Sequence, residues 1–206
     1  MSDTRGMTAD VSYAFTRDWF SQNITAWDQI FSQEKPRHIL EIGSFEGRSA
    51  CYTIEKLGAS VADGASLTCI DNWIGGQEHR DVGGFYQAVM SDAERRFNHN
   101  TRIALAKVSN KVTLRKIKQN SRDALAQFLA TAPLVQFDLI FIDGSREAPD
   151  VLADSVLAFP LLRVGGTLIF DDYIWSDQKP QQRDPLRMPK PAIDAFVNIY
   201  QRKIEF

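Results

Sequence analysis

The sequence has few cysteines, no long apolar run and almost no excess of charge of either sign. Its two cysteines, Cys51 and Cys69, are too few for a disulfide framework, and we expect free thiols in the cytoplasm. No apolar stretch approaches the roughly 20 residues that cross a bilayer, and residues 1–10 lack the apolar core of a signal peptide. A formal net charge of −2 gives no attraction to nucleic acid or acidic lipid, so neither partner is expected.

The residues that are present fit one globular domain over residues 1–206. Of these residues, 44% are apolar and 24% are charged, which is enough apolar surface for a sizeable core. Short apolar runs alternate with segments whose apolar residues recur at helical spacing. This alternation predicts an α/β fold with a doubly wound, mostly parallel sheet. The expected strands are residues 38–43, 66–71, 111–117, 137–143 and 165–172.

Three segments lie outside this alternation. Residues 13–31 are rich in aromatic side chains and predict an amphipathic helix, part of an N-terminal helical cap over residues 1–35. Residues 72–110 are too long for a simple crossover and predict a helical insertion. Residues 191–206 resemble a helix followed by the beginning of a strand. The C-terminal hairpin that usually closes such a sheet is therefore expected to be short, missing or supplied by a second copy in a homodimer.

A glycine-bearing turn joins the first expected strand to the first expected helix. Gly43 allows a tight turn, Gly47 allows the helix to begin close to the strand, and the N–H groups there favour the negative end of a ligand. Phe45 lies between the two glycines, where its bulk disfavours the pyrophosphate of a dinucleotide such as NAD. Glu41 suits a ligand with an ammonium group, and Asp71, at the end of the next strand, suits ribose hydroxyls. Turns of this kind also occur in α/β proteins that bind no nucleoside.

Three aspartates follow the ends of two later strands. Asp143 ends one expected strand, and Asp171 and Asp172 end the next. The carboxyl ends of parallel strands meet at one edge of the sheet, where mutual repulsion would raise the pKa of these carboxyls unless a cation were present. All-oxygen ligation suits Mg²⁺ or Ca²⁺, so the trio predicts a divalent metal site. The alternative is structural, because such aspartates also cap turns.

Together these motifs resemble the class I S-adenosylmethionine (SAM)-dependent methyltransferases over roughly residues 36–175. The resemblance implies that the glycine loop holds the methionine part of SAM, that Asp71 holds its ribose, and that Ser121 and Arg122 lie beside its adenine. The full cofactor-binding set that we expect is Glu41, Gly43, Ser44, Phe45, Gly47, Ser49, Asp71, Asn72, Trp73, Ser121, Arg122 and Asp143.

The aspartate trio and three longer stretches sharpen this resemblance. The stretches "NWIGGQEH", "DGSREAPDVLADSVLAF" and "GGTLIFDDYIW" are similar to the bacterial type 24 methyltransferase family, and the trio is similar to that of metal-dependent small-molecule O-methyltransferases. The resemblance implies a small-molecule acceptor whose hydroxyl binds a divalent metal, most simply Mg²⁺, and so loses its proton more easily. The implied metal ligands are Asp143, Asp171 and Asp172.

Arg146 departs from that pattern, because the related enzymes carry histidine or lysine there. Arginine is always protonated and cannot act as a base at neutral pH, but it can stabilise an alkoxide or clamp an anionic acceptor. It can equally form a surface ion pair with Glu147 or Asp150. His79 is the candidate replacement base, which makes Asp143, Arg146 and His79 the expected catalytic residues.

The expected function is therefore SAM-dependent methyl transfer to an oxygen of a small molecule. Two other functions stay open from the sequence. One is a methyltransferase-fold protein that binds the cofactor or assembles with partners without turnover, which Arg146 would support. The other is an NAD-linked oxidoreductase, which the spacing of Gly43 and Gly47 disfavours.

Overall fold

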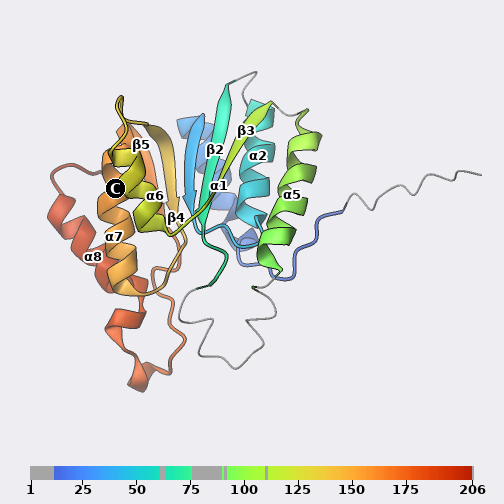
Figure 1. Ribbon diagram of the computed structural model, residues 1–206. Helices are drawn as coiled ribbons and strands as arrows, with labels where there is room; N and C mark the ends of the chain where they lie inside the picture. The colour runs from blue at the N-terminus through green and yellow to red at the C-terminus, as the bar shows by residue number, and fades with distance from the viewer. Residues whose placement is uncertain (1–11, 61–63, 76–89, 91, 110, 206) are drawn as a thin grey trace, which may run out of the picture.

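The computed structural model describes residues 12–60, 64–75, 90, 92–109 and 111–205. Within them, five parallel strands form one sheet in the order β3-β2-β1-β4-β5, which confirms the predicted α/β, doubly wound architecture (Figure 1). The central strands are almost wholly buried, as their continuous apolar runs lead one to expect. The strands are β1 (His38–Ile42), β2 (Ala65–Asp71), β3 (Val112–Lys118), β4 (Phe137–Ile142) and β5 (Leu162–Phe170).

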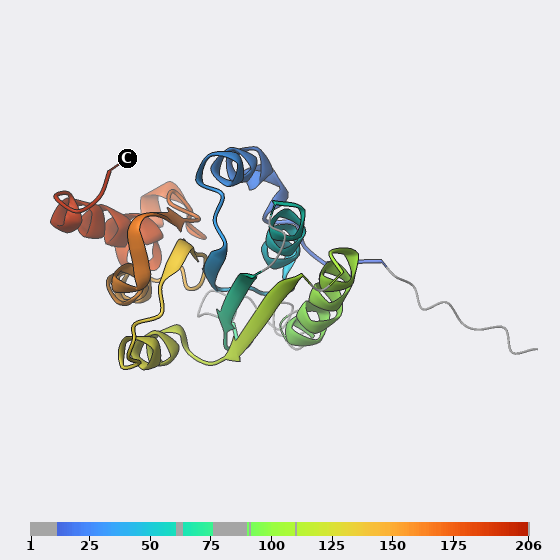
Figure 2. The same cartoon turned by 90° about the horizontal axis from the view of Figure 1, so that it is seen from above.

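Helices cover both faces of this sheet (Figures 1 and 2). One face carries α1 (Ile24–Glu34), α2 (Arg48–Ser60) and α5 (Ala93–Lys107). The other carries α6 (Ser121–Leu129) and α7 (Ala148–Ala158), and α8 (Pro189–Tyr200) packs against α7. Short 3₁₀ turns lie at Ser21–Asn23, Phe159–Leu161, Pro180–Gln182 and Pro185–Arg187.

Each face of the sheet has its own apolar core. Successive side chains of a strand point to opposite faces, so Ile39 and Leu139 belong to the core under α1, α2 and α5. Their neighbours Leu40 and Ile140 belong to the core under α6 and α7. With both faces covered, the edge beyond the carboxyl ends of the strands is left for a site. The strand order reverses beside β1, which is where ligands bind in open α/β sheets.

The N-terminal segment differs from the prediction of one helix over residues 13–31. The described residues before Ser21 are not helical, and α1 begins only at Ile24. The physical reason lies at Thr16, whose N–H and hydroxyl each donate to the buried carboxylate of Glu46 at 2.6 Å. These bonds hold the backbone away from the helix that its apolar spacing would favour. The predicted helical cap over residues 1–35 is thus helical in its second part, and residues 1–11 lie outside the described residues.

Smaller differences concern element ends. β5 begins at Leu162 and ends at Phe170, so Asp171 and Asp172 follow the strand rather than end it. The side chain of Asn120, not that of Ser121, caps α6 by accepting a hydrogen bond from the N–H of Arg122 at 3.0 Å.

The C-terminal part and the insertion agree with the expectation only where they are described. After α8 the described chain forms a turn, and no antiparallel strand joins the described sheet. Helix α5 lies within the predicted insertion, of which residues 76–89, 91 and 110 lie outside the described residues. No helix in the described part of the chain has the length and apolarity to cross a membrane. Cys51 and Cys69 are both buried and form no disulfide.

Candidate functional site

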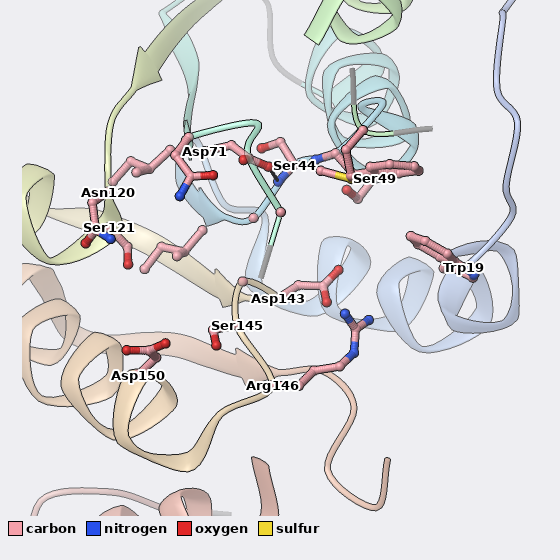
Figure 3. A pocket seen from close by; sticks show the side chains of 18 of the residues that line it. Trp19, Ser44, Ser49, Asp71, Asn120, Ser121, Asp143, Ser145, Arg146 and Asp150 are labelled. Atoms are coloured by element: carbon pink, nitrogen blue, oxygen red, sulfur yellow. Dashed lines mark hydrogen bonds between the residues drawn. The ribbon is translucent and has the colours of Figure 1, made fainter. Parts of the chain in front are cut away.

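A cavity of about 360 Å³ opens beyond the carboxyl ends of β1, β2 and β4 (Figure 3). Its volume is in the range of small-molecule sites. The wall comes from segments that are far apart in the sequence, and most of them follow a strand directly. The lining residues include 42–46, 48 and 49 after β1, 70–72 and 75 after β2, 119–122 after β3, 143–147 and 150 after β4, and also Arg17, Trp19, Phe20 and Met90.

The glycine loop after β1 is held against two neighbours. Gly43 has a φ of +85°, and a Cβ there would lie 2.0 Å from the carbonyl oxygen of Asp143. Gly47 has a φ of +80°, and a Cβ there would lie 2.9 Å from the ring of Phe97. The tight turn predicted at Gly43 therefore lets β1 and β4 end in backbone contact. Gly47 allows close packing against α5 rather than against the strand.

Asp71 fixes the conformation of this loop. Its Oδ2 accepts hydrogen bonds from the N–H groups of Ser44 at 2.8 Å and Phe45 at 2.9 Å. Its Oδ1 accepts one from the N–H of Trp73 at 2.6 Å. The amides expected to face the negative end of a ligand thus bind a carboxylate of the protein itself. An ionised carboxylate has about four acceptor positions, so Asp71 retains capacity for one further donor.

Three of the expected cofactor residues lie behind the described cavity wall rather than in it. Glu41 is buried, its Oε1 accepts a hydrogen bond from the hydroxyl of Ser49 at 2.8 Å, and burial raises its pKa to about 7. Trp73 is buried and donates from its indole N–H to the carbonyl oxygen of Phe45 at 2.7 Å. Gly47 is the third. These residues support the loop, while Ser49 and Phe45 line the cavity.

The expected adenine end is assembled at the start of α6. Ser121 and Arg122 line the cavity together with the capping residue Asn120. Arg122 also lies 3.6 Å from Asp150, measured from Nη2 to Oδ1, which connects α6 with α7 across the rim. Asn72 lines the cavity as expected.

Arg146 lies among the three aspartates. Its Nη2 is 2.5 Å from Oδ2 of Asp172, and its guanidinium carbon lies 5.0 Å from the centre of the Trp175 ring. In Figure 3 the guanidinium group points toward Asp143. The side chain is only 16% exposed, so the surface pair with Glu147 or Asp150 that the sequence left open is not its main setting.

The pKa values of this cluster reflect its crowding. Burial raises the pKa of Asp143 well above its ordinary value, and the charge of Asp171 raises it further, while Arg146 opposes the rise. Burial likewise raises the pKa of Asp171. The trio is therefore brought together as the sequence predicted, with one guanidinium group as its compensating cation.

These residues do not fit a ready-made divalent metal site. Oδ1 of Asp171 accepts a hydrogen bond from the N–H of Asp172 at 2.8 Å, and its Oδ2 accepts one from the side-chain amide of Asn23 at 3.3 Å. Oδ2 of Asp172 is engaged by Arg146. Among the residues that the structure describes, no group of three or more acidic, histidine or cysteine side chains is arranged to hold a metal ion. Three of the carboxylate oxygens that a metal would need, both of Asp171 and Oδ2 of Asp172, already face donors of the protein.

Several lining residues could not be found from the sequence. Trp19, which lies in the aromatic-rich segment expected to form a helix, stacks on Phe45 with ring centres 4.9 Å apart and lines the cavity. Arg17 and Arg48 line it too, and the Nε–H of Arg48 donates to the carbonyl oxygen of Arg17 at 3.3 Å. No local motif marks these residues. His79, the candidate base, lies outside the described residues.

A cavity at the switch point of a doubly wound sheet, bordered by a glycine loop and strand-end carboxylates, defines a Rossmann-like ligand-binding protein. The model of the type 24 family of methyltransferase domains matches residues 40–173, more than half of the chain. The chain belongs to this methyltransferase family. A comparison with curated proteins finds no match.

Two solved structures illustrate the shared fold. An O-methyltransferase from Bacillus cereus in complex with SAH aligns with a TM-score of 0.59 and 19% identity, covering 91% of this chain and 72% of that chain. TomG, an O-methyltransferase from Streptomyces achromogenes involved in tomaymycin synthesis, was solved in complex with SAM. It aligns with a TM-score of 0.59 and 18% identity, covering 93% of this chain and 71% of that chain.

Proposed function

We propose that the protein transfers a methyl group from SAM to an oxygen of a small-molecule acceptor. The observation that carries this proposal is the cavity at the switch point of a methyltransferase-family domain, with the glycine loop between the strand-end residues Asp71 and Asp143. The similar folds named above are O-methyltransferases whose structures contain SAM or its demethylated product, S-adenosylhomocysteine (SAH). This likeness supports the choice of oxygen as the acceptor atom.

The lining residues have the chemistry that SAM requires. Asp71 retains acceptor capacity for a ribose hydroxyl, and Ser121 and Asn120 offer polar groups at the adenine end. Arg17 and Arg48 are cations that suit the carboxylate of the methionine part. SAM, when bound, supplies a methyl group on a positively charged sulfur. The predicted role of Glu41 with the ammonium group becomes an indirect one, through Ser49.

The residues of the chain must then position the acceptor and exclude water. Methyl transfer joins the acceptor oxygen to the methyl carbon as the carbon–sulfur bond breaks, and the acceptor's proton has to leave. The stacked rings of Trp19 and Phe45 form an apolar wall that limits water in the cavity. Asp143 and Arg146 line the cavity where polar groups can meet an acceptor hydroxyl. His79 stays the predicted base.

Four finer expectations stay predictions. A divalent metal at Asp143, Asp171 and Asp172 was predicted from the sequence, and the engagement of these carboxylates by Arg146 and Asn23 argues against it as the site stands. A cytoplasmic location and a homodimer are likewise predictions. So is the absence of a nucleic-acid partner, for which the net charge of −2 is the support.

Calorimetric titration with SAH and, separately, with NAD tests the cofactor assignment. We expect one molecule of SAH to bind per chain and NAD not to bind. NAD binding without SAH binding would overturn the proposal in favour of an oxidoreductase. Turnover is then measured as SAH release from SAM in the presence of phenolic, sugar and carboxylate-bearing acceptors.

A second function is favoured by one observation. Among the described residues that line the cavity there is no histidine and no lysine, so carboxylates such as Asp143 are the groups there that could accept a proton. The alternative is a methyltransferase-fold protein that binds the cofactor without turnover. Tight SAH binding with no SAH release across the acceptor panel would support this alternative.

A further inference from the structure

The loop after β5 is shaped around the guanidinium group of Arg146. Asp172 has a φ of +57°, in the left-handed region, and its carbonyl oxygen accepts a hydrogen bond from the N–H of Trp175 at 2.8 Å. This turn brings the Trp175 ring to one side of the guanidinium and the Asp172 carboxylate to another. A non-glycine residue in this conformation costs about 1 kcal/mol, so the turn must be stabilised by the contacts that it makes.

The charge of the same guanidinium group also acts at the end of the neighbouring strand, β4. Arg146 follows β4 by four positions, and its charge acts on Asp143 and Asp171 as well as on Asp172. The charge of a single side chain therefore acts on all three carboxylates at the edge where β4 and β5 end, with a direct ion pair to Asp172. Its charge is permanent, because arginine does not lose its proton at any ordinary pH.

A guanidinium group and a divalent metal compete for the same oxygens. Mg²⁺ demands near-octahedral oxygen ligation, with carboxylates whose lone pairs are free to point at the ion. Here Oδ2 of Asp172 lies 2.5 Å from Arg146, and both oxygens of Asp171 accept hydrogen bonds from the protein. The positive charge that such a carboxylate cluster needs is already supplied by a side chain.

We propose that Arg146 is the resident cation of this cluster, in place of a divalent metal, and that the methyltransferase site operates without metal. The claim that methyl transfer needs no metal rests on the proposed function, while the claim that Arg146 is the cation of the cluster does not. Arg146 also lines the main cavity, so its charge is presented to an acceptor oxygen as that oxygen loses its proton. Arg146 is thus a positioning residue that also faces the acceptor.

Binding of Mn²⁺, followed by electron paramagnetic resonance, tests the proposal with a readout other than activity. The wild-type chain is expected to bind no Mn²⁺ at this cluster up to about 1 mM. Arg146→Ala removes the competing cation and should create a site at least about tenfold tighter than any in the wild type. Adding Asp171→Asn to Arg146→Ala should abolish that site.

Arg163→Ala is the matched control. Arg163 forms a comparable pair with Asp138, with Nε 2.6 Å from Oδ1, in a part of the sheet away from the cavity. Its removal takes a cation away from one carboxylate and not from a cluster of three, so no Mn²⁺ site should appear. This control separates the loss of an arginine in general from the loss of the cation that serves three aspartates.

Two results would overturn the proposal. One is a wild-type chain that binds one Mn²⁺ and loses it on Asp171→Asn, and the other is an Arg146→Ala variant that gains no Mn²⁺ site. If Arg146→Ala does not fold, Arg146→Gln, which keeps the length of the side chain but not its charge, takes its place. SAH titration of the same samples tests the proposed function separately, so failure of one proposal leaves the other readable.

Discussion

Asp71 and Asp143 both lie where a parallel strand ends, both line the same cavity, and yet the protein holds them in opposite ways. Asp71 accepts three hydrogen bonds from backbone N–H groups, those of Ser44, Phe45 and Trp73. Asp143 lies instead among charged side chains, and its pKa is raised by burial and by the charge of Asp171 and lowered by that of Arg146. Two carboxylates at equivalent positions of the fold therefore have different surroundings, backbone N–H groups in one case and charged side chains in the other.

The difference indicates how the two halves of the cavity are built. The half at Asp71 is set by the course of the backbone, since its carboxylate binds amides of the loop that it orders. The half at Asp143 is set by the balance of side-chain charges. The first half should therefore respond mainly to changes that disturb the backbone, and the second mainly to changes of charge.

Substitution at the junction of the two halves should have the largest effect. In Gly43→Ala, a Cβ would lie 2.0 Å from the carbonyl oxygen of Asp143, at a φ of +85°. We expect a loss of about 4 kcal/mol in the free energy of unfolding, from backbone strain and overpacking together. In the control Gly165→Ala, φ is +72° but the Cβ would meet only the Nη1 atom of Arg163, at 3.6 Å. That variant should lose about 1 kcal/mol from strain alone. Urea denaturation measures both, and equal losses would show that the contact between β1 and β4 does not matter.

Glu41→Gln should change how the stability of the protein depends on pH, because Glu41 is a buried carboxyl under the glycine loop. Burial raises the pKa of Glu41 from 4.5 to about 7, so the folded state binds more protons than the unfolded state between these values. Stability due to this group is therefore complete below pH 4.5 and is lost as the pH rises through 7. The free energy of unfolding of Glu41→Gln should therefore exceed that of the wild type by up to about 3 kcal/mol at pH 8, and by little at pH 4.5. Urea denaturation at both pH values measures this, and parallel pH profiles for the two proteins would contradict it.

The two strand-end aspartates can be compared directly by replacing each with asparagine. Asp71→Asn leaves one good acceptor for three N–H donors and should cost about 2 kcal/mol, with weaker SAH binding. Asp143→Asn removes a carboxylate that burial and Asp171 disfavour, and should not destabilise the fold at pH 8. Chemical denaturation and SAH titration of the two variants measure the contrast. Equal losses of stability would mean that the two halves are not built differently.

The half of the cavity at Asp71, which is set by the course of the backbone, was largely predictable from the sequence. Buried parallel strands read as continuous apolar runs, and a glycine followed by a helix signal marks the loop whatever surrounds it. Asp71 was found because strand-end carboxylates have a fixed place in this fold. Its role was not found, since which N–H groups a carboxylate accepts depends on local geometry that spacing does not encode.

For the half of the cavity at Asp143, the sequence predicted which residues come together but not how they pair. The aspartates were placed together because parallel strands end at one edge, but the pairing of Arg146 with Asp172 depends on side-chain conformations. The N-terminal segment was predicted as a helical cap, but neither its non-helical course before Ser21 nor the place of Trp19 in the cavity wall was predicted. Its position follows from the bonds between Thr16 and Glu46, which are 30 residues apart, and no local pattern reports such a contact.

Trp19 provides the smallest test of the comparison, because it lines the cavity from the N-terminal segment and not from a strand end. Its ring stacks on Phe45 at 4.9 Å with 28° between the planes, and 41% of the residue is exposed. Trp19→Ala should cost only about 1 kcal/mol of stability, the value of one aromatic pair at a partly exposed position. Trp19→Phe keeps the stacking and should stay within about 0.5 kcal/mol of wild type. The ring lies beside the glycine loop, so Trp19→Ala should also raise the KM for the acceptor. SAH binding should weaken less, because Asp71 still holds the loop. A loss of SAH affinity as large as that of Asp71→Asn would show instead that the wall, and not the backbone, organises the cofactor half.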